Sequence, residues 1–149
     1  MIMTKNEVLS KIIEEQNTII TNLENSVSRY KTASDIDEND SIDPEDFSHQ
    51  EEAKEMQLRY EQMLIQANKN LEVLASYKTK SYTTIESGAL VETEDLYLFI
   101  GISVQQFKLN GKNVITISEQ APIYNSLKEK TVGEKIAIGT IQNIILSIS

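Results

Sequence analysis

The chain has 149 residues, a formal net charge of -9 and no cysteine. The lack of cysteine excludes disulfides and thiolate metal sites, and the acidity argues against direct binding of bare nucleic acid, which requires clustered Lys and Arg. No apolar run approaches the roughly 20 residues of a bilayer span, and the start lacks the apolar core of a secretory signal, so we expect a cytoplasmic protein of one or two small domains without membrane contact.

The first predicted element is a helix over residues 4–33. Thr4 followed by Glu7 has the spacing of a capping box, in which two residues satisfy free N–H groups at a helix start. Apolar residues then recur every three or four positions, which places them on one face of the helix. They are Leu9, Ile12, Ile13, Ile19, Ile20, Leu23, Val27 and Tyr30, and Gln16 interrupts them. A helix of this length needs a partner for its apolar face.

An acidic segment follows, over residues 34–47. Between Ser34 and Ala53 the chain carries nine acidic residues and no Lys or Arg, whereas the remainder balances fourteen acids with fourteen bases. This one stretch therefore accounts for the whole net charge. Its spacing does not fit an EF-hand, because the glycine of the sharp turn and the ligand series are missing. A solvated acidic loop is the simplest interpretation of its first acids.

A second helix is predicted to begin at residue 44. Asp43 is a favourable N-cap, and Pro44 suits the first helical position. The apolar face of this helix carries Ala53, Met56, Tyr60, Met63, Leu64, Ala67, Leu71 and Leu74. Two matched helices joined by a short polar connector favour an antiparallel coiled-coil hairpin over residues 1–78, with arms of roughly 40–45 Å and the acidic segment at its tip.

Beyond residues 76–84 the apolar pattern changes from a helical period to alternation. Strands are predicted at Ala89–Glu92, Leu96–Ile102, Val114–Ile117, Lys135–Ile138 and Gln142–Ile148, with a short helix over Pro122–Lys130. These elements predict an α+β domain over residues 79–149, consisting of a small antiparallel sheet and one short helix.

Residues 121–136 resemble the C-terminal signature of the Gre-type transcript-cleavage factors, GreA and GreB. In that signature a Ser-Pro-aliphatic start leads through a leucine to Val-Gly-acid and a strand. The matching residues are Pro122, Ile123, Leu127, Lys130, Val132, Gly133 and Glu134, while Ala121 replaces the serine. Gly88–Val91, Tyr97–Gly101 and Ala53–Glu55 look like further family segments, so the resemblance spans nearly the whole chain in order.

The resemblance implies a transcription elongation factor whose coiled-coil tip enters the secondary channel of bacterial RNA polymerase. Asp43 and Asp46 align with the family's tip carboxylates, which help to hold a second Mg²⁺ beside the polymerase's own ion while the polymerase cuts backtracked RNA. The chain would then be no enzyme by itself, and nucleic acid would be reached only through the polymerase. The C-terminal domain resembles an FKBP-like fold that docks at the channel rim, for which we expect Pro122, Ile123 and Gly133 to make contacts.

The predicted tip also departs from the family pattern. Family cleavage factors carry Asp-Leu-Ser-Glu-Asn there, whereas this chain has Asp43, Pro44, Glu45, Asp46 and Phe47. The second acid is shorter by about one methylene, a shift to which metal catalysis is sensitive. A non-cleaving modulator of the secondary channel, like DksA or the Gre-like inhibitors, therefore remains an alternative. A structural adaptor with an intermolecular coiled coil is a third hypothesis, although matched helices within one chain favour a monomer.

Overall fold

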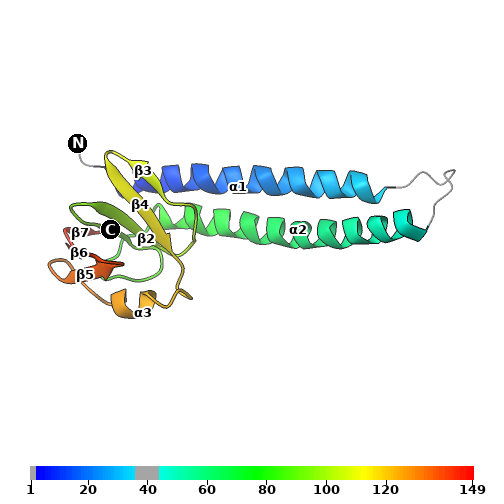
Figure 1. The fold of residues 1–149 in the computed structure, drawn as a ribbon. Helices are drawn as coiled ribbons and strands as arrows, with labels where there is room; N and C mark the ends of the chain where they lie inside the picture. The colour runs from blue at the N-terminus through cyan, green and yellow to red at the C-terminus, as the bar shows by residue number, and fades with distance from the viewer. Residues whose placement is uncertain (1–2, 36–43) are drawn as a thin grey trace. The chain divides into compact units, whose positions relative to one another are not determined.

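The computed structural model describes residues 3–35 and 44–149 (Figure 1). The chain groups into two compact units. The hairpin unit is Gln16–Leu71, and the sheet unit combines Met1–Glu15 with Glu72–Ser149. The division at residues 78 and 79 expected from the change of period remains a prediction about domains.

Two long helices run through the chain, as the apolar periods predict. Helix α1 spans Lys5–Ser34 and helix α2 spans Pro44–Tyr77. Within the hairpin unit the two helices lie side by side (Figure 1). Their shared core contains Ile20, Leu23 and Ala67, surrounded by partly buried apolar side chains. The predicted helical hairpin is therefore confirmed.

Polar groups inside the hairpin unit are paired across the two helices. Gln16, the residue that interrupts the apolar face of α1, is only 2% exposed, and its Nε2 donates a hydrogen bond of 2.9 Å to the backbone oxygen of Ala67. Tyr30 and Tyr60 stack with ring centroids 5.4 Å apart and an interplanar angle of 12°. Because these contacts need particular partners, they fix one register between the helices.

The sheet unit begins with the start of α1, where Thr4 and Glu7, the two residues of the predicted capping box, hydrogen-bond each other. The backbone N–H of Glu7 donates to Thr4 Oγ1 at 3.2 Å, and the Thr4 hydroxyl donates to Glu7 Oε1 at the same distance. Further along, Val8, Leu9 and Ile12 pack into a core with strand residues. The first turns of α1 are therefore fixed by a cap and by buried apolar contacts.

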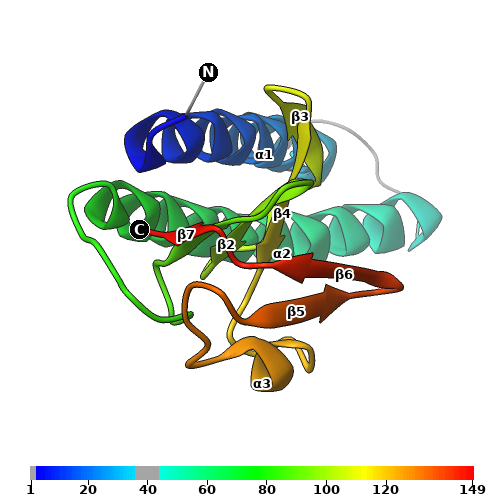
Figure 2. The same cartoon turned by 90° about the vertical axis from the view of Figure 1, so that its left-hand side faces the viewer.

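In the described part of this unit, seven strands form two sheets, and Figure 2 shows β5 and β6 side by side. The strands are β1 (Leu90–Glu92), β2 (Leu96–Ile100), β3 (Phe107–Leu109), β4 (Lys112–Ile117), β5 (Lys135–Ile138), β6 (Ile141–Ile144) and β7 (Ser147–Ile148). The five-stranded sheet has the order β3-β4-β2-β1-β7, and β5 pairs with β6 in a separate two-stranded sheet. The predicted strand at Gln142–Ile148 is therefore two strands, which belong to different sheets.

The prediction of an antiparallel sheet was wrong for one pair, since β2 and β4 run parallel. Their register pairs Leu96 with Asn113 and Ile100 with Ile117. Strand β3, which was not predicted from the sequence, lies between them in the chain and pairs antiparallel with β4. With β3 included, the chain reverses twice rather than once, so β4 returns in the direction of β2. The fold is α+β with a mixed sheet.

Strand β2 is buried on both faces, and all five of its residues are buried. Tyr97 and Phe99 point into the core that contains Val8, Leu9, Ile12 and Leu74 of the helices. Leu96, Leu98 and Ile100 face the second core, with Leu127, Ile136 and Ile145. A strand covered on both faces has a continuous apolar sequence, which explains why Leu96–Ile100 lacks alternation.

The short helix α3 spans only Tyr124–Leu127, whereas Pro122–Lys130 was predicted. Lys128 leaves the helix with φ -57° and ψ 145°. The backbone of the next residues is used elsewhere, because Glu129 N–H donates to Ile85 O and Ile85 N–H donates to Lys130 O, both at 2.9 Å. Pairing with a distant segment therefore ends the helix early.

Candidate functional site

One of the two predicted tip carboxylates, that of Asp46, lies in the first turn of α2. Asp43 falls outside the described residues. Pro44 is the first helical residue, as predicted, and Glu45 and Asp46 follow in the first turn with exposed side chains. The positive end of the helix dipole favours acidic side chains at this place. Of the two predicted site residues, the structure thus places Asp46 on an exposed helical turn.

A group of polar contacts joins the end of α1 to α2 near this turn. Gln50 Nε2 donates to the backbone oxygen of Ser34 at 2.7 Å, and the Ser34 hydroxyl is 3.2 Å from Gln57 Oε1. Ser34 is only 4% exposed. The carbonyl groups of the last helical turn lack partners within their own helix, so Gln50 satisfies one of them from the neighbouring helix. We call Ser34, Gln50 and Gln57 the tip clasp.

The tip clasp was not predicted from the sequence. Its members are ordinary polar residues, and their only signal is that Gln50 and Gln57 lie seven positions apart, so they share one face of α2. Phe47 and His49 are exposed on the same turns, Phe47 by 50%. An exposed aromatic ring next to Asp46 gives this end of the hairpin unit an apolar contact point as well as charge.

The described residues provide no metal site of their own. They contain no group of three or more His, Asp or Glu side chains that could hold an ion. Carboxylate oxygens are nevertheless the ligands that Mg²⁺ prefers, and this ion usually takes only one or two of them from one protein. The chemistry of Asp46 therefore fits a shared ion, while the contribution predicted for Asp43 remains a prediction.

The three predicted docking residues all belong to the sheet unit but differ in exposure. Pro122 is exposed ahead of α3, whereas Ile123 is partly buried and packs against the second core. Gly133 is exposed with φ +92°, and its N–H donates to Ile145 O at 2.9 Å. A side chain at Gly133 would meet no other atom within 4 Å, so its positive φ explains the glycine there without any ligand.

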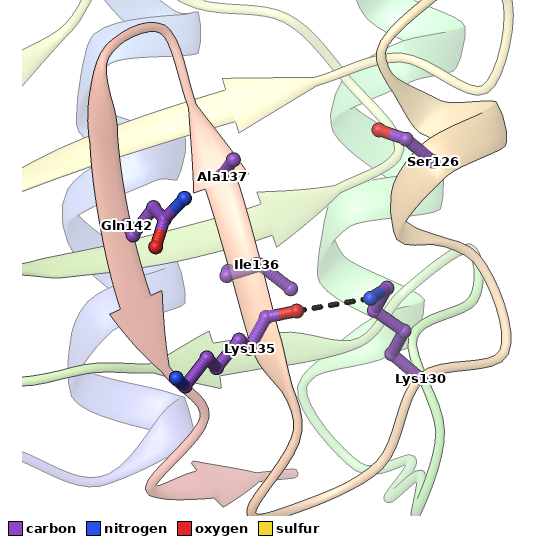
Figure 3. Close-up of a pocket in the computed structure, with 6 residues that line it drawn as sticks. All are labelled: Ser126, Lys130, Lys135, Ile136, Ala137 and Gln142. Carbon is purple, nitrogen blue, oxygen red and sulfur yellow. Dashed lines mark hydrogen bonds between the residues drawn. The ribbon is translucent and has the colours of Figure 1, made fainter.

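A hollow of about 280 Å³ lies between α3 and the β5–β6 hairpin (Figure 3). Its lining consists of Ser126, Lys130, Lys135, Ile136, Ala137 and Gln142. Lys130 Nζ donates to Lys135 O at 2.9 Å, which holds one cation at the rim. The lining carries amines, a hydroxyl and an amide but neither an acid nor an aromatic ring. It therefore fits contact with an acidic segment better than prolyl isomerisation, for which aromatic walls are expected.

The helices offer no membrane span, since none in the described part of the chain is both long and apolar enough to cross a bilayer. Comparison with known protein families and with curated proteins finds no match to this chain. The Gre-type resemblance of residues 121–136 therefore remains a prediction from the sequence.

Proposed function

We propose that this chain binds bacterial RNA polymerase as a transcription elongation factor and brings its acidic hairpin tip to the active centre through the secondary channel. The polymerase then cuts backtracked RNA, and the chain stimulates that reaction without being an enzyme. The observation that carries the proposal is the start of α2, where Glu45 and Asp46 are exposed on a turn next to the tip clasp.

The acidic tip supplies oxygen ligands rather than a complete metal site. Asp46, together with Asp43, would contribute carboxylate oxygens to a magnesium ion for which the polymerase provides the remaining ligands. Such an ion, when bound, stabilises charge on the attacking and leaving oxygens of phosphodiester hydrolysis. The tip clasp supports this role, because it holds the first turns of α2 against the end of α1.

The sheet unit is proposed to be FKBP-like and to dock at the rim of the channel. Pro122 and Gly133 are exposed, and the hollow beside α3 presents Lys130 and Lys135. These cations would attract an acidic segment of the polymerase. The contact made by each residue belongs to the proposal and can be tested by substitution.

The test is transcript cleavage in a backtracked elongation complex of the source organism's polymerase. The intact chain should shorten the RNA. Asp46→Ala and Asp43→Ala should each reduce the rate of cleavage by at least about tenfold, a change of about 1.4 kcal/mol in the activation barrier. Both variants should still bind the polymerase. Glu72→Ala is the matched control, because it removes an exposed acid of α2 away from the tip. If Glu72→Ala slows cleavage as much as Asp46→Ala, the assignment of the tip is wrong.

A non-cleaving modulator of the same channel is the second candidate, and Phe47 favours it. This ring is 50% exposed beside Asp46, at the position where the resembled cleavage factors carry a polar asparagine. An exposed ring at that place can pack against protein or RNA without assisting hydrolysis. Unchanged RNA in the cleavage assay, combined with altered initiation that Phe47→Asn abolishes, would favour this candidate over the first.

A further inference from the structure

Three aliphatic side chains, Ile141, Ile144 and Leu146, are exposed on and just after strand β6, and the last two lie two residues apart. Ile144 is 50% exposed and Leu146 is 54% exposed, whereas their neighbours Asn143 and Ile145 are 6% and 1% exposed. The alternation places Ile144 and Leu146 on one face of the extended chain. We call this pair the β6 ridge. Neither side chain contributes to the two cores of the sheet unit.

Hollows flank the ridge. One, of about 250 Å³, is lined by Glu94, Asp95, Gln142, Asn143, Ile144 and Leu146. The other, of about 230 Å³, is lined by Lys135, Gln142, Asn143 and Ile144. The ridge is therefore a raised apolar line with space on its flanks, a shape that can receive alternate side chains of a bound segment.

The first hollow carries two carboxylates held by a rigid turn. The hydroxyl oxygen of Thr93 accepts hydrogen bonds from the N–H groups of Asp95 and Leu96 at 3.3 and 3.1 Å. The preceding acid, Glu92, is paired with Lys112 at 2.8 Å. Glu94 and Asp95 are exposed and make no ion pair within the described residues. The turn thus fixes the backbone that carries them, and their carboxylates are available to a cation from outside.

A buried amide lines both hollows. Asn143 Nδ2 is buried and has no hydrogen-bond partner among the described residues. Among the described residues, no other buried side-chain nitrogen or oxygen lacks a hydrogen-bond partner. Leaving such a donor unsatisfied is costly. By the alternation along β6, this side chain lies on the buried face, opposite Ile136 in the β5–β6 register and away from the β6 ridge.

The backbone of β6 also has an open edge here. Ile145 exchanges hydrogen bonds with Glu134 and Gly133 on the β5 side, whereas Leu146 N–H donates to Glu92 O on the opposite side at 2.8 Å. Because backbone groups alternate between the two edges of a strand, those of Gln142 and Ile144 point to the same side as Leu146. No strand of the described chain pairs with β6 on that side.

We propose that β6 binds an extended segment of a partner protein in which a lysine or arginine alternates with aliphatic residues. The segment adds to the open edge at Gln142 and Ile144, its aliphatic side chains cover the β6 ridge, and its cation meets Glu94 and Asp95. A second copy of this chain fits less well, because pairing two β6 strands would bring the carboxylates of both copies together. The inference does not require the partner to be a polymerase.

The test is a titration of the ¹⁵N-labelled full chain followed by amide NMR spectra. The probe is a blocked pentapeptide that alternates lysine and valine, and the control peptide alternates glutamate and valine. The lysine peptide should shift the backbone amides of Gln142 and Ile144, and the glutamate peptide should not. Absence of these shifts at millimolar lysine peptide, or equal shifts with both peptides, would overturn the proposal.

Variants localise the contact. The double change Glu94→Gln and Asp95→Asn should weaken binding by about three- to tenfold, as expected for two exposed charges. Ile144→Ser should weaken it similarly, whereas the matched controls Glu55→Gln and Ile65→Ser, on exposed positions of α2, should leave it unchanged. Undiminished peptide affinity after the double change would contradict the proposed contact. The same amide shifts on raising the protein concentration without peptide would also contradict it and would indicate self-association. Cleavage assays are a separate readout, so failure here leaves the proposed function standing.

Discussion

Replacement of Asn143 by leucine should stabilise the protein. Asn143 is 6% exposed, lies opposite Ile136 in the β5–β6 register, and its Nδ2 lacks a partner within the described residues. An unsatisfied buried donor costs about 1–3 kcal/mol. Leucine has a similar length and removes this cost, and its branched end would contact the apolar side of the hairpin. Part of the gain is offset because the site must accommodate a slightly larger side chain.

We therefore expect Asn143→Leu to raise the free energy of unfolding by about 1–2 kcal/mol. At roughly 2–4 °C per kcal/mol for a chain of this size, the midpoint temperature should rise by about 2–8 °C. Urea unfolding followed by circular dichroism measures the change, provided that the slope with denaturant stays the same. Asn143→Ala is the control, because it removes the amide but leaves a cavity, so its stability should stay close to that of the unchanged chain.

A loss of more than about 1 kcal/mol in Asn143→Leu would refute this reasoning, since it would mean that the amide has a partner whose removal is costly.

Three further predictions concern other parts of the chain. Gly88→Ala should lower the free energy of unfolding in urea by about 2–5 kcal/mol, because φ at Gly88 is +94° and a Cβ would lie 2.5 Å from the ring of Tyr77. The control Gly133→Ala, where φ is +92° and no atom lies within 4 Å, should cost only about 1 kcal/mol. Equal losses in the two variants would show that the tyrosine ring moves aside. Burial lowers the pKa of Lys5 to about 8, so the folded chain releases this proton at a lower pH than the unfolded chain. The free energy of unfolding should therefore rise from about pH 8 to pH 10. Lys5→Met should flatten that rise, and a rise that persists in this variant would assign it to another group. Gln50→Ala removes the hydrogen bond to the backbone oxygen of Ser34. Amide hydrogen exchange in the last turn of α1 should then accelerate about fivefold, which corresponds to about 1 kcal/mol. Unchanged exchange would mean that the tip clasp does not hold the end of α1.

The sequence predicted the helices well because their apolar period and their caps are local properties. Thr4 and Glu7 satisfy each other within one turn, and Pro44 can begin a helix wherever its partner lies. The exposed position of Asp46 follows from the same local rules. Strands β1, β2, β4 and β5 were also recognised within a few residues, since β-branched and aromatic runs favour extended chain.

Only the tertiary structure decided which segments pair and which polar groups are satisfied. The direction of β4 depends on β3, a three-residue strand too short to produce a periodic signal. The length of α3 depends on Ile85, a residue distant in the chain whose backbone bonds to Glu129 and Lys130. The alternation of β6 predicted a strand but not that Asn143 would be buried without a partner, because hydrogen bonding depends on neighbours brought together by folding. Local propensity thus set the long helices and most strands of this protein, whereas the pairing of distant backbone groups set its topology, the end of α3 and its candidate binding edge.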